Sequence, residues 1–212
     1  MRTKLRFFFI FLCAISIEAV HSETGTKTRE ALEKTADSVV TSIAAAENRE
    51  SDKVTADFLR RQPSRKGMFV SVFDVKTRKL RGCMGSLVAE KANLYEEVTH
   101  WATMAMVFDT RGKTGKGKRK YAVIVSFIEG IEPVSDPLEV NSITHGIMVR
   151  VPGRQELVLP GEAFTTAYAM RIISGKFGFD AQRAGAEYFR IHAERFGAGI
   201  RLFKKFDGGY GG

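Results

Sequence analysis

The segment LRGCMGS at residues 80–86 is the most unusual stretch of this chain. Gly82 and Gly85 flank Cys83, and glycine lets a backbone turn tightly and lets a ligand approach closely. The neighbouring Arg81 supplies a positive charge, which favours a thiolate and can also bind an anion. The segment therefore predicts a backbone cradle around a nucleophilic thiol, with a buried structural cysteine in a β-bulge as the alternative.

Strand patterns lie on both sides of this motif. Residues 68–75 alternate and are rich in Val and Phe, which predicts a strand, and residues 76–79 predict the turn that leads into the motif. Further strands are predicted at residues 121–127, 145–151, 156–159 and 200–206, the middle two forming a hairpin that turns at Pro152 and Gly153.

Apolar residues at helical spacing predict four helices. Asn93 can cap one of them, with Glu96 three residues later as in a capping box. The apolar residues of that helix share one face: Leu94, Val98, Trp101, Ala102, Ala105 and Met106. The other helices are predicted at residues 28–46, 162–174 and 180–195, with a charged, polar link at 47–66.

These strands and helices are interspersed without a regular βαβ alternation. That order favours an α+β fold, a compact single domain in which helices pack on a mixed or antiparallel sheet. The predicted divisions are a signal peptide at 1–22, a short leader at 23–27, the α+β domain at 28–206 and a Gly-rich tail at 207–212.

The N-terminus has the layout of an export signal. Three positive residues precede an apolar run at 7–17, which is shorter than the roughly 20 residues of a membrane-spanning helix. Val20 and Ser22 stand where signal peptidase needs small side chains, which predicts cleavage after Ser22, or else after Ala19. We expect a periplasmic or extracellular protein that is not integral to the membrane after cleavage; an uncleaved anchor is the alternative.

The composition is basic and poor in cysteine. The chain has 33 Lys/Arg against 24 Asp/Glu, and removal of residues 1–22 leaves a net charge of +7. A balance of this size suits anionic partners such as phosphates, acidic sugars, nucleic acid or anionic lipid. Cys83 is the only cysteine after cleavage, so the domain has no internal disulfide, and its thiol is either buried and inert or exposed and reactive.

A second basic feature is the stretch at residues 111–120. It contains Gly-Lys-Thr, but the glycine that a phosphate-binding loop requires five residues upstream is Val107, which excludes that motif. The stretch can still neutralise phosphates or acidic glycans, or else serve as a solvated tether. The polyanion-binding candidates are Lys113, Lys116, Lys118, Arg119 and Lys120.

The segment LRGCMGSL at 80–87 resembles the signature of the AMMECR domain family, in which Leu-Arg-Gly-Cys-Ile-Gly is typical. The likeness continues in order through residues 67–70, 108–111, 123–127, 132–134, 145–147 and 157–160, and covers roughly residues 28–206. The resemblance implies a compact α+β fold of unestablished activity, with the cysteine motif as the active region. It also implies Memo-like and radical SAM neighbours, from which an exported member would be separated.

The candidate site residues follow from the motif and from this resemblance. Cys83 is the candidate nucleophile, and His145, which stands beside Gly146 at a position that matches the family, is a base if it lies near the thiol and otherwise structural. The ligand-binding candidates are Arg81, Gly82, Gly85, Asp109 and Arg111, of which the last two form a structural ion pair in the alternative interpretation.

Three classes of function fit these residues, the third being a structural accessory domain whose cysteine belongs only to the core. The first is an enzyme or small-ligand-processing protein with a pocket at the cysteine motif. The second is a non-catalytic module that binds an anionic small molecule, an envelope polymer or a partner protein. One cysteine and three scattered histidines in the mature chain lack metal-ligand spacing, so we expect no metal site, and the sequence indicates no cofactor.

Overall fold

The computed structural model describes residues 21–45, 52–109, 120–182 and 185–202. A single antiparallel sheet of six strands, ordered β2-β1-β3-β6-β4-β5, forms its centre. The strands are β1 Met68–Asp74, β2 Leu80–Ser86, β3 Tyr121–Val134, β4 Gly146–Val151, β5 Arg154–Val158 and β6 Glu187–Phe196. The helices are α1 His21–Ala45, α2 Lys53–Arg60, α3 Leu94–Val107 and α4 Thr166–Phe177, with short 3-10 turns at Pro137–Glu139 and Ala198–Leu202. The predicted α+β class is confirmed.

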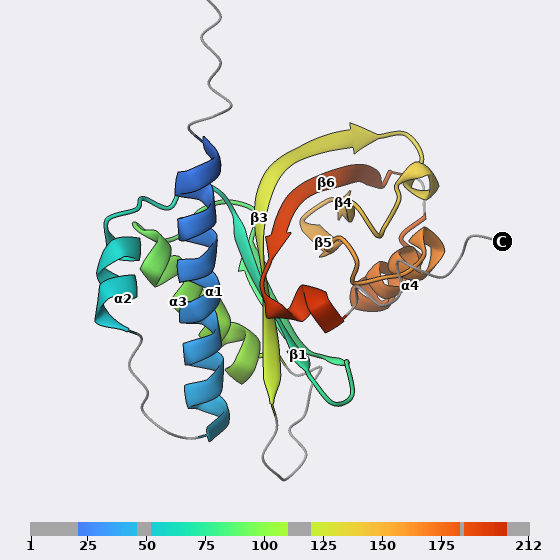
Figure 1. Cartoon of the computed structure of the whole chain (residues 1–212). Helices are drawn as coiled ribbons and strands as arrows, with labels where there is room; N and C mark the ends of the chain where they lie inside the picture. The colour runs from blue at the N-terminus through green and yellow to red at the C-terminus, as the bar shows by residue number, and fades with distance from the viewer. Residues whose placement is uncertain (1–20, 46–51, 110–119, 183–184, 203–212) are drawn as a thin grey trace, which may run out of the picture.

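The sheet is strongly curled. The long strands β3 and β6 arch over the β4–β5 hairpin, while α1, α2 and α3 lie together at the other end of the molecule (Figure 1). Helices α1 and α3 pack on Val70, Val72, Val123 and Val125 through Leu32, Val98 and Trp101, and α4 covers the hairpin. None of the described helices is long and apolar enough to cross a membrane.

The opposite side of the strands encloses a smaller core, which we call the inner face. Because side chains alternate along a strand, Phe69 and Ser71 of β1 point away from α1 and α3. All six strands contribute side chains to the inner face, and Cys83 packs against its core. Its core residues are Phe69, Ile128, Met148, Leu159 and Ile191. The curl therefore brings the cysteine motif and the hairpin to one interior.

Several predicted elements agree with the structure. Strand β1, helix α3 and the hairpin lie where their patterns place them, Asn93 accepts the Glu96 N–H, and Gly153 turns the hairpin with φ +74°. The first helix begins at His21 instead of Thr28. The predicted tail at 207–212, nearly all of the signal peptide and most of the basic stretch lie outside the described residues.

Four predictions of local structure are wrong. Residues 187–196 form strand β6 instead of a helix, because their backbone pairs with β3 on one side and β4 on the other. The predicted polar link contains α2, which Asp52 caps. Helix α4 starts after its cap Thr165, not at Glu162. The closing strand predicted at 200–206 is wrong over residues 200–202, which belong to a 3-10 turn, and its remainder lies outside the described residues.

Candidate functional site

The cysteine motif forms strand β2 with a bulge, rather than the backbone cradle that the sequence predicts. A side chain at Gly82 would overlap the carbonyl oxygen of Ala105 in α3, and one at Gly85 would overlap Phe69 of β1. Both glycines are therefore needed for close packing between elements. Gly85 also lies on the wall of the cavity that contains Cys83, whereas Gly82 does not.

Arg81 lies away from the thiol. In the β1–β2 register Val72 pairs with Gly82 but Phe73 pairs with Leu80, so Arg81 is the extra residue of a β-bulge. Its guanidinium donates to the carbonyl oxygens of Met106 at 2.9 Å and Asp109 at 3.2 Å. Arg81 thus caps the C-terminal end of α3, where a positive charge is favourable.

Asp109 holds the cysteine backbone. Its side chain is buried, and its Oδ2 accepts the N–H of Cys83 at 2.8 Å. This N–H lies on the side of β2 that no strand covers, because β2 is an edge of the sheet. Asp109 therefore positions Cys83 from outside the sheet, whereas Arg111, its predicted partner, lies outside the described residues.

The thiol of Cys83 contacts a serine that also reaches a carboxylate. Cys83 is partly buried, and its Sγ lies 3.2 Å from the hydroxyl of the cross-strand residue Ser71. The same hydroxyl makes a longer contact of 3.5 Å with Oε1 of Glu162. The second oxygen of Glu162 accepts the N–H of Leu159 at 3.1 Å. Cys83, Ser71 and Glu162 form a continuous polar chain on the inner face.

The guanidinium of Arg195 lies near the contacts that join Cys83, Ser71 and Glu162. Arg195 is partly buried on β6, and burial lowers the pKa of its guanidinium, an effect that electrostatic interactions with Glu162 and Cys83 oppose. The guanidinium lies against Gly161, next to Glu162. Arg195 thus supplies to the inner face the positive charge that the sequence led us to expect from Arg81.

A cavity of about 300 Å³ opens between the two edge strands of the sheet. Its walls include Cys83 on β2, Leu157 on β5, and Glu162 and Lys176. The Nζ of Lys176 donates to the carbonyl oxygen of Leu157 at 2.5 Å. This volume lies at the lower end of the range for small-ligand sites, about 300–1,000 Å³. Cys83 therefore lies on the wall of a cavity whose volume would admit a small molecule.

His145 is not brought to the thiol. Its ring meets that of His192 edge to face with centroids 4.9 Å apart, and burial is the main cause that lowers the pKa of His145. Nε2 of His192 lies 3.2 Å from Glu132. His192 and Arg195 point to opposite sides of β6, because their positions differ by an odd number. This histidine pair therefore belongs to the other face of the sheet.

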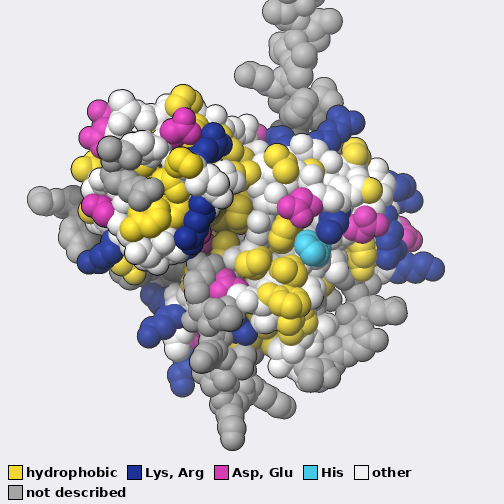
Figure 2. Space-filling model, turned by 180° about the vertical axis from the view of Figure 1, so that it is seen from behind, with side chains coloured by type: hydrophobic (Ala, Val, Ile, Leu, Met, Phe, Trp, Pro, Cys, Tyr) yellow, Lys and Arg dark blue, Asp and Glu magenta, His cyan; other side chains and the backbone are white. Residues whose placement is uncertain are grey.

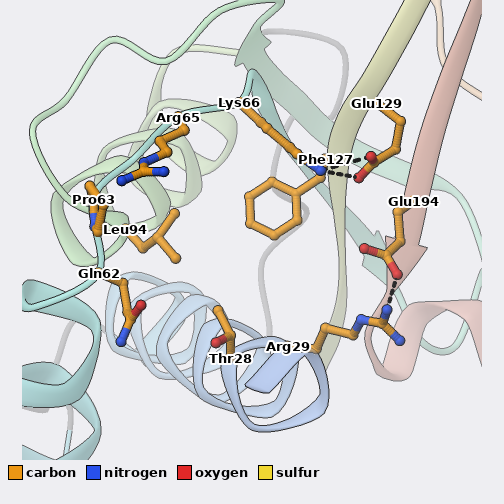
Figure 3. A pocket seen from close by; sticks show the side chains of 11 residues that line it. Thr28, Arg29, Gln62, Pro63, Arg65, Lys66, Leu94, Phe127, Glu129 and Glu194 are labelled. Atoms are coloured by element: carbon orange, nitrogen blue, oxygen red, sulfur yellow. Dashed lines mark hydrogen bonds and ion pairs between the residues drawn. The ribbon is translucent and has the colours of Figure 1, made fainter. Parts of the chain in front are cut away.

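A larger cavity of about 780 Å³ lies apart from Cys83, beside the N-terminal half of α1 (Figure 3). Phe127 forms part of its wall and packs on the helix-covered side of β3. Two of its cations are engaged in ion pairs, Lys66 with Glu129 and Arg29 with Glu194. This cavity is lined by neither a cysteine nor a histidine, whereas the smaller one contains the candidate nucleophile Cys83.

Only one of the five polyanion-binding candidates is among the described residues. Lys113, Lys116, Lys118 and Arg119 lie outside the described residues, and Lys120 is exposed immediately before β3. On the face seen from behind, Lys and Arg side chains are scattered among acidic and hydrophobic ones (Figure 2). The described part of the chain also holds no group of three or more His, Cys, Asp or Glu that could bind a metal ion.

A comparison with models of protein families shows to which family this chain belongs. The family model described as AMMECR1 matches residues 13–198. The chain belongs to the AMMECR1 family. The match begins inside the predicted signal peptide and covers the whole sheet. No curated protein was found that is similar to this chain.

A solved structure shows the same AMMECR1-type fold. It is that of an uncharacterized protein, PH0010, from Pyrococcus horikoshii, with a TM-score of 0.60 and 18% sequence identity. The similarity covers 81% of this chain and 91% of that one. At this identity the likeness supports the fold alone.

Four inner-face residues escaped the sequence analysis: Ser71, Ser126, Glu162 and Arg195. The two serines carried a signal, since each interrupts a strongly apolar strand at Val70–Val72 and Val125–Phe127. A polar residue inside such a run needs a partner when it is buried. Glu162 and Arg195 carried no such signal, because both were assigned to predicted helices.

Proposed function

We propose that this AMMECR1-family chain binds a small molecule in the cavity between β2 and β5 and that Cys83 attacks it as a nucleophile. The observation that supports this proposal is the chain of contacts from the thiol through Ser71 to Glu162 on the cavity wall. A thiol next to a proton acceptor and a positive charge is the usual arrangement of a reactive cysteine.

The geometry suggests a proton route. A hydroxyl group has one proton to donate and lone pairs to accept another. When Ser71 donates to Glu162, its oxygen can accept the proton of the Cys83 thiol. Transfer along this route leaves a thiolate at Cys83 and a protonated carboxyl group at Glu162. The thiolate can then bond to an electrophilic atom of the ligand, whose leaving group departs with the bonding electrons.

The surrounding residues favour this step. The guanidinium of Arg195 interacts electrostatically with Cys83, and a nearby positive charge stabilises the thiolate over the thiol. Asp109 fixes the backbone of Cys83, which limits the orientations open to the thiol. Ser71 and Glu162 are thus proton-transfer candidates, Arg195 stabilises charge, and Asp109 is a positioning residue.

Alkylation kinetics test this proposal. We expect iodoacetamide to label folded protein at Cys83 at neutral pH, and Ser71→Ala and Glu162→Gln to slow that labelling about tenfold each. The matched control is Glu156→Gln, because Glu156 also lines the cavity but pairs with Arg154 at 3.1 Å. Labelling that appears only after denaturation would show a structural cysteine and overturn the proposal.

Ligand affinity and turnover of a Cys83→Ser variant separate catalysis from binding alone. A non-catalytic binding module would retain ligand affinity in Cys83→Ser, whereas an enzyme would retain binding but lose turnover. A ligand that co-purifies with the protein, identified by mass spectrometry, supplies the compound for this comparison. We also propose, from the pattern of residues 1–22, that the protein acts outside the cytoplasm.

A further inference from the structure

We infer that the ligand of the Cys83 cavity carries a carboxylate or phosphate group, which binds the guanidinium of Arg195. The inference rests on the proposed function for the location of the site and adds the chemical class of its ligand. It assigns to Arg195 and Ser126 a binding role that the sequence motif does not include.

Arg195 points to the inner face. On β6, Phe189, Ile191 and Ala193 pack into the core of that face, and Arg195 follows two residues later on the same side of the strand. The guanidinium of Arg195 lies so close to Gly161 that a side chain at residue 161 would collide with the guanidinium. Gly161 adjoins Glu162, whose side chain lines the cavity. The guanidinium is therefore held near the cavity.

Within the described residues, the positive charge of Arg195 has no ion-pair partner. Among the described residues, no ion pair or hydrogen bond engages its guanidinium, and the oxygens of Glu162 are used by Leu159 and Ser71. Burial lowers the pKa of Arg195, and the opposing interactions with Glu162 and Cys83 are smaller than this effect. Removing a charge from water is costly without a partner of opposite sign. A ligand anion would supply that partner.

Ser126 is a second polar group in need of a partner. It is the cross-strand neighbour of Arg195 on β3 and also of Phe69, which lines the cavity. Only 1% of Ser126 is exposed, and its Oγ has no hydrogen-bond partner within the described part of the chain. A buried hydroxyl without a partner is rare in proteins. An anion oxygen at Arg195, directly or through a water, would satisfy it.

The cavity wall favours a small anion. Lys176 adds a positive charge there, while the negative charge of Glu156 is balanced by Arg154. A guanidinium presents parallel N–H donors that match the paired oxygens of a carboxylate or phosphate. The volume of about 300 Å³ limits the ligand to a small molecule.

Two alkylating reagents of nearly the same shape test the inference. Iodoacetate carries a carboxylate and iodoacetamide a neutral amide, and each forms a sulfur–carbon bond to Cys83 while iodide leaves. The thiol proton ends in solvent, in the folded protein after its transfer through Ser71 to Glu162. We expect the ratio of the iodoacetate rate to the iodoacetamide rate to be about tenfold higher in folded protein than in urea-unfolded protein. The unfolded chain serves as the reference because its thiol has no pocket.

Variants assign the effect to Arg195. We expect Arg195→Gln to return the ratio to the unfolded value and Arg195→Lys to retain part of the preference. The matched control is Arg190→Gln, because Arg190 lies on the other side of β6 and pairs with Glu132 at 2.7 Å. An unchanged ratio in Arg195→Gln, with its fold verified by circular dichroism, would overturn the inference.

A measurement on the unaltered protein covers the case in which the variant does not fold. At constant ionic strength, we expect inorganic phosphate to slow iodoacetamide labelling of Cys83 more than chloride does. Equal rates in both salts together with an unshifted reagent ratio would overturn the anion inference and leave the reactive thiol in place. Failure of both reagents to label folded protein would instead overturn the proposed function.

Discussion

Gly82 illustrates how a single residue joins the motif to the helices. Its missing side chain lets the carbonyl oxygen of Ala105 approach β2, and the same end of α3 accepts Arg81 and leads to Asp109. We expect Gly82→Ala to destabilise the protein by about 1–3 kcal/mol, because the added methyl group forces α3 away from the strand. Urea unfolding measures this loss. Gly130→Ala is the control, since its methyl group would meet only His192, at 3.9 Å, and an equal loss in both variants would refute the packing argument.

At the scale of the element, a buried carboxylate fixes α3 to the segments around it. Glu97 is fully buried and accepts hydrogen bonds from the Trp101 indole at 2.7 Å, the Lys91 N–H at 2.7 Å and the Ser64 hydroxyl at 3.1 Å. We expect Glu97→Gln to lower the free energy of unfolding by about 2 kcal/mol, because an amide presents a donor to groups that themselves donate. Thermal and urea unfolding check this value.

The control for this element is Glu96→Gln. Glu96 lies in the same first turn of α3, but its side chain is exposed, so the substitution should change stability by less than about 0.5 kcal/mol. Similar stability of the two variants would show that the buried carboxylate does not anchor α3. Because α3 also supports β2, the Glu97 variant should in addition alter the rate at which Cys83 is labelled.

At the scale of the whole molecule, the prediction concerns cleavage of the N-terminal signal peptide. Cleavage after Ser22 would remove only the first two residues of α1, which begins at His21, so the processed chain should keep the fold. We expect N-terminal sequencing of protein from the envelope or the medium to begin at Glu23, and its thermal unfolding to match that of a chain produced from Glu23. Recovery of the form that begins at Met1 in the membrane would instead indicate an uncleaved anchor.

The sequence by itself determined the elements whose signals are local. Helix α3 was predicted from its Asn93 cap and its apolar face, β1 from its alternation, and the hairpin from its turn at Gly153. In each case residues close in sequence carry the physical cause. Cys83 was also singled out from the sequence as the candidate nucleophile, because its motif is compact and contiguous.

Only the tertiary structure decided β6 and the site. The residues of β6 form a strand because β3 and β4 satisfy their backbone groups, and those partners are distant in sequence. The curl of the sheet then brings Ser71, Glu162 and Arg195 to Cys83, while the bulge turns Arg81 away. Contacts between residues so far apart depend on strand pairing and sheet curvature, which no local pattern in the chain records.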